Sequence, residues 1–183
     1  MTIGGAIALL AATMLTIDKI ALLQAKADGT AKTLSCDISA WVSCSGVMES
    51  KQAAAFGFAN SVIGVIGFSV VLTLGVLLLA GVTFPRWIWA GLQVGVLFGI
   101  GFVTWLQSQS IFVIDRLCPW CMVVWAVMIP LFVLVSAHNL RLFAPQNVVT
   151  RFLDDWAGLV IALWYVAVVA TIWFAFGPEK LFG

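Results

Sequence analysis

Charged side chains are scarce in this sequence. Asp, Glu, Lys and Arg make up 9% of the 183 residues, whereas hydrophobic residues make up 63%. This leaves too little polar side-chain surface to cover a hydrophobic core in water. The composition therefore excludes a soluble globular protein and predicts an integral membrane protein.

The sequence also lacks a basic surface and clustered histidines. The formal net charge is +1, and His138 is the single histidine. Binding to nucleic acid requires a basic face, and many zinc sites are built with several histidines. We therefore expect no nucleic-acid partner and no histidine-built metal site.

The sequence contains several long apolar runs. About twenty apolar residues at 1.5 Å per residue cross a hydrocarbon core roughly 30 Å thick. Five segments reach this length, at about residues 3–23, 56–82, 87–106, 118–137 and 156–176. Pro85-Arg86, the polar run Gln107–Ser110 and the charged stretch His138–Asp155 separate the later segments. The sequence predicts an all-α integral membrane protein with five transmembrane helices.

The first apolar segment is expected to be a helix that stays in the membrane. It lacks the basic start and the small-residue cleavage site of a signal peptide, and its apolar run is longer than usual for one. No internal repeat and no soluble domain are visible. We expect a single membrane domain over residues 1–183, with a polar loop at residues 24–55.

Glycines recur in the second and third segments. Gly91, Gly95 and Gly99 follow one another at four-residue spacing, which places them on one face of a helix. Such a ridge is typical of close contact between transmembrane helices. We expect it to serve ordinary packing in the bundle.

The four cysteines form two closely spaced pairs. Cys36 and Cys44 lie in the polar loop, and Cys118 and Cys121 open the fourth apolar segment as C-P-W-C. With five spans, the loop and the turn before Cys118 lie on the same side of the membrane. Both pairs then face one compartment, which thiol–disulfide exchange between them requires.

Cys118 and Cys121 are spaced for a bond that opens easily. Pro119 suits the first position of a helix, and helical neighbours three residues apart have Cβ atoms about 5–6 Å apart. A relaxed disulfide needs about 3.5–4.5 Å, so the first turn must depart from an ideal helix. The spacing favours redox exchange over two alternatives, purely structural disulfides and a zinc site made by all four cysteines.

The side of the membrane does not follow from charge. A count of Lys and Arg would place the cysteines inside, although Arg86, Arg141 and Arg151 lie on the opposite side. Disulfides persist in oxidising compartments, and the short arginine-bearing connections are typical of cytoplasmic turns. We therefore expect a protein of the cytoplasmic membrane with both cysteine pairs on the extracytoplasmic side.

Three motifs together resemble the vitamin K epoxide reductase family. They are the C-x7-C loop Cys36–Cys44, the segment Phe56–Gly64 with Asn60 near the start of the second span, and Cys118–Cys121. Their order and intervals match the family over most of the first 137 residues. Within the family, the motifs are most similar to those of actinobacterial members.

The resemblance implies a bundle of four helices around a quinone, with a fifth helix at its periphery. It also implies a relay in which Cys36 accepts electrons from a partner, Cys44 passes them to Cys118, and Cys121 lies against the quinone. We expect no fused thioredoxin-like domain. The expected partner is therefore a separate thioredoxin-fold protein similar to the Dsb oxidases, and the expected quinone is menaquinone rather than ubiquinone.

The expected quinone site is mostly hydrocarbon with one or two hydrogen-bond donors. Asn60 matches the family's quinone-binding asparagine, and Ser61 is a second polar candidate beside it. Trp125 stands where animal members carry a tyrosine, a departure that favours plain quinone reduction over epoxide reduction. Asp37 and Arg116 are expected to be solvated loop groups or partner-recognition charges.

These residues imply a quinone-dependent thiol oxidoreductase that regenerates an extracytoplasmic disulfide oxidase. An alternative is a membrane redox sensor or assembly subunit that turns over no quinone. The sequence does not distinguish the oxidoreductase from the sensor or assembly subunit well, because either protein would carry the same cysteine pairs.

Overall fold

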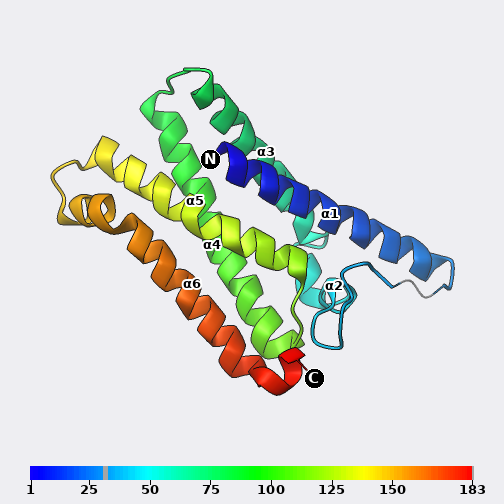
Figure 1. Cartoon of the computed structure of the whole chain (residues 1–183). Helices are drawn as coiled ribbons and strands as arrows, with labels where there is room; N and C mark the ends of the chain where they lie inside the picture. Colours follow the sequence, from blue (N-terminus) through cyan, green and yellow to red (C-terminus); the bar gives the residue numbers. More distant parts are fainter. Residues whose placement is uncertain (31–32, 183) are drawn as a thin grey trace.

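The computed structural model describes residues 1–30 and 33–182, with side chains through residue 177 (Figure 1). Within the predicted loop 24–55, residues 31 and 32 lie outside the described residues. The five long helices are α1 (Thr2–Ala27), α3 (Asn60–Leu79), α4 (Arg86–Gln109), α5 (Pro119–Phe143) and α6 (Val148–Phe182). The short elements are α2 (Cys44–Met48), the 3-10 turn η1 (Lys51–Ala54) and the π-turn η2 (Ser110–Ile114). Among the described residues, five helices are long and apolar enough to cross a membrane, which confirms the predicted all-α membrane fold.

α3 is shorter than the predicted segment 56–82. Gly57 and Gly81 have positive φ angles of 84° and 83°, a conformation that helices do not contain and that glycine adopts without a steric penalty. α3 therefore lies between them, from Asn60 to Leu79.

α4 continues past its predicted end. The polar run Gln107–Ser110 was expected to leave the membrane, but it stays helical and leads directly into η2. One polar group of this run is satisfied within the helix, since the Ser108 hydroxyl donates to the Trp105 carbonyl at 2.7 Å. The third span therefore reaches Ile114 rather than residue 106.

α5 and α6 are also longer than predicted. α5 includes His138, whose ring lies 3.9 Å from the ring of Trp89, centroid to centroid. Arg141 at the end of α5 forms a salt bridge with Asp154 near the start of α6 at 2.5 Å. Gly177, at φ 63°, marks a kink in α6 just after the predicted end at residue 176.

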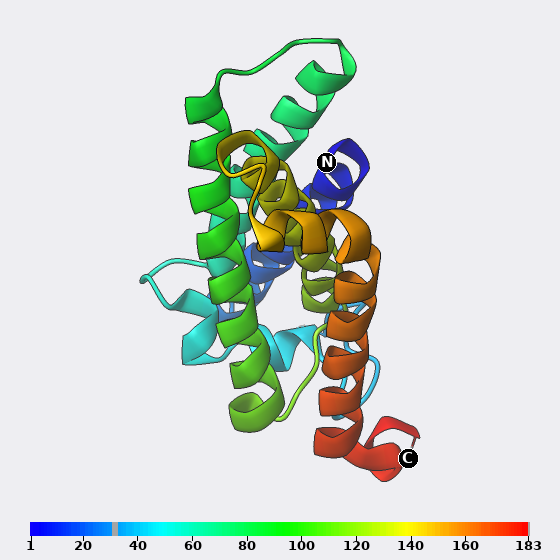
Figure 2. The same ribbon diagram turned by 90° about the vertical axis from the view of Figure 1, so that its left-hand side faces the viewer.

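α5 is the central helix of the bundle. It packs against α1, α4 and α6, while α3 packs against α1. Figures 1 and 2 show α6 on the outside, along α5 and away from α3. The expected fifth, peripheral helix is α6.

α3 and α4 follow one another in sequence but barely touch each other. A Cβ atom at Gly91 or Gly95 of α4 would meet no other atom within 4 Å. The expectation that these two glycines serve helix packing is therefore wrong, because α4 turns them toward the space that α3 leaves open. Gly99, the third glycine of the ridge, does pack, since a Cβ atom there would lie 2.8 Å from Cε of Met128 in α5. A second close contact joins α1 and α3, where a Cβ atom at Gly75 would lie 2.8 Å from the backbone nitrogen of Thr2.

Candidate functional site

The loop between α1 and α3 holds a disulfide. Cys36 and Cys44 are bonded, with their Cα atoms 5.7 Å apart. Cys44 is fully buried and begins α2, and Cys36 is 7% exposed. Ser43 caps this helix by accepting a hydrogen bond from the amide of Gly46 at 3.1 Å.

Asp37 organises this loop. Its carboxylate accepts hydrogen bonds from the Leu34 amide at 2.9 Å, the Ser43 hydroxyl at 2.8 Å and the Ser45 amide at 3.0 Å. Partial burial acts to raise the pKa of Asp37, but these hydrogen bonds outweigh it and lower the pKa to about 2. The expectation of a solvated or partner-binding charge is wrong for Asp37, because its side chain ties together the residues around both loop cysteines.

A short bridge joins the loop to the segment before α5. Val42 and Leu117 form an isolated parallel bridge. The Ser43 amide donates to the Leu117 carbonyl at 2.9 Å, and the Leu117 amide donates to the Trp41 carbonyl at 2.8 Å. Leu117 is 2% exposed, so the hydrogen bonds that pair the two segments are shielded from solvent.

The bridge brings the two cysteine pairs together. Cys118 Sγ lies 3.5 Å from Cys44 Sγ, and both residues are fully buried. Cys118 and Cys121 are free thiols. The predicted placement of both pairs on one side is confirmed by this contact.

Cys118 occupies the N-cap of α5, with Pro119 at the first helical position as predicted. A hydrogen bond with the Cys121 side chain lowers the pKa of Cys118, while burial acts to raise it. The backbone amides of Cys121 and Trp120 also lower the pKa of Cys118. Thiolate at a helix N-terminus is favoured by such amides, so the position of Cys118 favours its ionised form.

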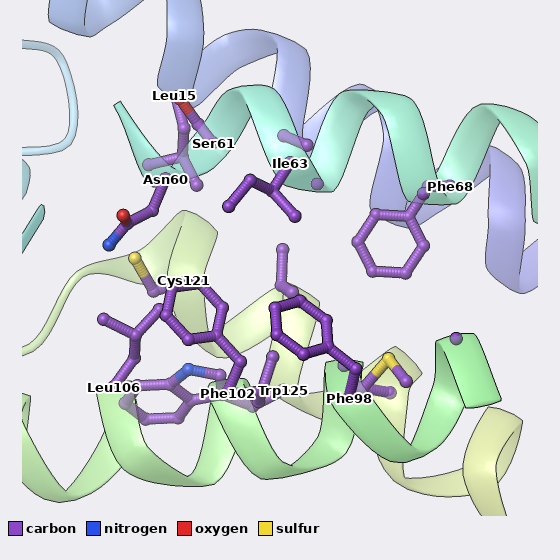
Figure 3. A pocket seen from close by; sticks show the side chains of 18 of the residues that line it. Leu15, Asn60, Ser61, Ile63, Phe68, Phe98, Phe102, Leu106, Cys121 and Trp125 are labelled. Carbon is purple, nitrogen blue, oxygen red and sulfur yellow. The ribbon is translucent and has the colours of Figure 1, made fainter. Parts of the chain in front are cut away.

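Cys121 lines a cavity of about 630 Å³ between the helices. The walls come from α1, α3, α4 and α5 and are mostly hydrocarbon. Figure 3 shows Cys121 and Asn60 at the same end of this cavity, with Phe68 and Phe98 farther along it. The Cys121 thiol therefore lies at one end of the apolar cavity.

The predicted residues Asn60, Ser61 and Trp125 all line the same cavity. The Asn60 side chain accepts from the Ala55 amide at 3.0 Å and donates to the Gln52 carbonyl at 2.6 Å. Ser61 accepts a hydrogen bond from the Thr16 hydroxyl at 2.9 Å. Asn60 thus also ties η1 to the start of α3, and Ser61 ties the start of α3 to the middle of α1. Trp125 is 5% exposed and lies in the cavity wall below Cys121 in Figure 3.

Lys19 and Asp18 were not among the predicted site residues. Lys19 lines the cavity, and Asp18 Oδ2 lies 3.9 Å from Cys36 Sγ. The signal was present, because ionisable residues inside an apolar span are costly and commonly mark a functional site. Among the described residues, no group of three or more His, Cys, Asp and Glu side chains is arranged to hold a metal ion.

Comparison with known families agrees with this geometry. The model of the vitamin K epoxide reductase family matches residues 1–136, a range that contains both cysteine pairs and the cavity residues named above. No match is found among curated proteins. Since the family match covers most of the chain, this chain belongs to the vitamin K epoxide reductase family, whose members are membrane redox enzymes that generally use a quinone as electron carrier.

Proposed function

We propose that this protein is a quinone-dependent thiol oxidoreductase that regenerates an extracytoplasmic thioredoxin-fold disulfide oxidase. The observation that carries the proposal is the 3.5 Å contact between Cys44 Sγ and Cys118 Sγ. It joins a loop disulfide to a dithiol whose second member, Cys121, lines an apolar cavity. Electrons have a continuous path along these sulfurs.

The relay begins at Cys36. Of the two loop cysteines, Cys36 is 7% exposed and Cys44 is fully buried, so a partner thiolate reaches Cys36 first. The partner dithiol becomes a disulfide, and the Cys36–Cys44 bond opens to two thiols. Two electrons and two protons have then entered the loop.

Cys44 passes the electrons inward. Its thiolate attacks Sγ of Cys118 in a Cys118–Cys121 disulfide, and Cys121 leaves as a thiolate. Cys36 then attacks Cys44, which closes the loop disulfide and frees Cys118. The product has the loop disulfide formed and two free thiols at Cys118 and Cys121, which is the redox state of the described residues.

The cavity suits a quinone, which is apolar with two carbonyl oxygens. Bound there, a quinone would supply an acceptor for the two electrons and two protons that Cys118 and Cys121 lose when they form a disulfide. Asn60 has two amide hydrogens, and its bond to Gln52 uses one of them. Asn60 and Ser61 would hold the carbonyl end, and Trp125 would form the wall.

The cavity is also open toward lipid. Val70 of α3 and Phe98 of α4 line it and are 51% and 53% exposed, on two helices that barely touch. An apolar tail would leave between these helices. We propose menaquinone rather than ubiquinone as the physiological quinone, in keeping with the resemblance to actinobacterial members.

We further propose that the cysteines face the extracytoplasmic side of the cytoplasmic membrane and that residues 1–183 form one membrane domain. The partner would be a separate protein similar to the Dsb oxidases. Ile38, between the loop cysteines, is 73% exposed. It offers such a partner an apolar contact beside Cys36.

An anaerobic thiol count tests the function. The fully reduced protein has four thiols, and one equivalent of a short-chain menaquinone should remove two of them within the assay time. A second equivalent should remove the other two through the relay. Unchanged thiols with added quinone would contradict the proposal and favour the alternative, a redox sensor or assembly subunit without quinone turnover.

A further inference from the structure

Lys19 is the one charged side chain among the described residues that line the cavity. It lies on the same face of α1 as Ala12 and Leu15, which also line it, at spacings of three and four residues. Leu15 lies beside Asn60 and Ser61 in Figure 3. Lys19 follows one turn later along α1, in the direction of the cysteine loop. The ammonium group therefore belongs to the end of the cavity that holds Asn60 and Cys121.

The charge of Lys19 has no carboxylate opposite it. Lys19 forms no salt bridge in the described part of the chain, and no Asp or Glu lines the cavity there. Its neighbour Asp18 points instead to Cys36 Sγ, at 3.9 Å. A cation in a mostly hydrocarbon wall is costly unless it binds something of opposite charge.

One contact of the ammonium group is accounted for. Lys19 Nζ donates to the carbonyl oxygen of Met48, the last residue of α2, at 2.5 Å. An ammonium group has three N–H donors, so this bond leaves two for the cavity.

We propose that Lys19 is the anion-binding group of this cavity and stabilises a negatively charged oxygen of a reduced quinone. This inference rests on the proposed function. When Cys118 and Cys121 form a disulfide, they lose two electrons and two protons. The ligand's oxygens take up both electrons, and the protons reach them from the thiols. A fixed positive charge at this end favours the electron-rich form before its oxygens are fully protonated.

A purely structural role for Lys19 makes a different prediction. A cation at the C-terminus of α2 would stabilise that short helix and nothing else. Lys19→Gln separates the two roles, because the amide can still donate to Met48 but carries no charge. Lys19→Arg keeps the charge. Lys26→Met is the matched control, since Lys26 lies on the same helix, is exposed and does not line the cavity.

The experiment measures binding rather than turnover. The oxidised protein in detergent is titrated with 2-methyl-1,4-naphthoquinone, which is neutral, and with 2-hydroxy-1,4-naphthoquinone, which is an anion at neutral pH. Quenching of tryptophan fluorescence reports the dissociation constant of each. The wild type should prefer the anion. Lys19→Met and Lys19→Gln should each lose about tenfold to a hundredfold of that preference, while Lys19→Arg and Lys26→Met should retain it.

The outcomes separate this inference from the proposed function. Equal weakening of both ligands in Lys19→Met would overturn the anion-binding role and leave a structural one. A wild type that binds both naphthoquinones without preferring the anion would overturn the role of Lys19 and leave quinone binding intact. A wild type that binds neither would overturn both proposals.

Discussion

Ser43 donates its backbone N–H to the carbonyl oxygen of Leu117 at 2.9 Å, and the next residue in each segment is a cysteine. This bond and its neighbour from Leu117 to Trp41 fix the register of two segments more than seventy residues apart. The register places Cys44 Sγ 3.5 Å from Cys118 Sγ. Exchange between the pairs therefore needs no large movement of the loop.

The relay predicts different defects for the two inner cysteines. Cys44→Ser should leave Cys118 and Cys121 reducible by small dithiols but abolish oxidation of a thioredoxin-fold partner, because the step between the pairs is missing. Cys118→Ser should leave the loop cysteines reduced, because Cys44 has lost its acceptor. Alkylation with a mass-tagged maleimide, followed by gel shift, reports both. Wild-type partner oxidation by Cys44→Ser would show that the order is wrong.

Asp37 should make the loop sensitive to acid. Its pKa falls from 3.8 to about 2 on folding, so the protein gains stability from the ionised carboxylate above about pH 4. That gain is lost as the pH falls from about 4 toward 2. Asp37→Asn should cost about 1 kcal/mol at pH 7, after discounting for solvent screening of a half-buried group, and little at pH 2. Thermal unfolding in detergent across this pH range measures the difference; an equal cost at both pH values would mean that the charge is irrelevant.

Asn60 has both a structural contact and a proposed ligand contact. Asn60→Asp keeps an oxygen that accepts from Ala55 but removes the amide donor, both toward the quinone and toward the Gln52 carbonyl. It should weaken quinone binding by about 1–3 kcal/mol, roughly tenfold to a hundredfold. Asn60→Ala and Asn60→Leu should lose the same donor and the tie to Ala55 as well. Quinone affinity is compared with the rate of exchange between the cysteine pairs without quinone. Losses of equal size in both would make Asn60 a folding residue.

Gly75 of α3 and Gly95 of α4 should differ in their tolerance of a methyl group. Gly75→Ala forces a Cβ atom to within 2.8 Å of the Thr2 backbone and should destabilise the packing of α1 on α3 by about 1–3 kcal/mol. Gly95→Ala meets no atom within 4 Å and should leave stability unchanged or slightly raised. Thermal unfolding of the two variants side by side tests the contrast. Destabilisation by Gly95→Ala comparable to that of Gly75→Ala would contradict the open cavity.

The orientation in the membrane has a direct test. A membrane-impermeant maleimide added to intact cells after mild reduction should label Cys36 or Cys44. A cysteine introduced by Gln146→Cys, at an exposed site in the turn between α5 and α6, should stay unlabelled until the cells are opened. The reverse pattern would place the cysteine pairs in the cytoplasm and support the sensor alternative.

Properties that depend on local composition were predicted most reliably from the sequence. The five spans followed from twenty-residue apolar runs, and the start of α5 followed from Pro119 beside Cys118. Helix ends were less reliable. In the polar run Gln107–Ser110, which stayed helical, Ser108 bonds within the helix and Gln109 bonds to Gln52, contacts that composition does not reveal.

The sequence by itself determined that this is a helical membrane protein with two cysteine pairs on one side, because span length and span parity are counted along the chain. Only the tertiary structure decided which sulfurs meet, since the contact of Cys44 with Cys118 depends on hydrogen bonds between distant backbone segments. The tertiary structure also decided that Gly91 and Gly95 of α4 face the cavity and that Lys19 lies in the cavity wall. The reason is physical. The chemical type of a residue limits what its side chain can bind, but the rotation and packing of its helix determine which neighbours that side chain contacts.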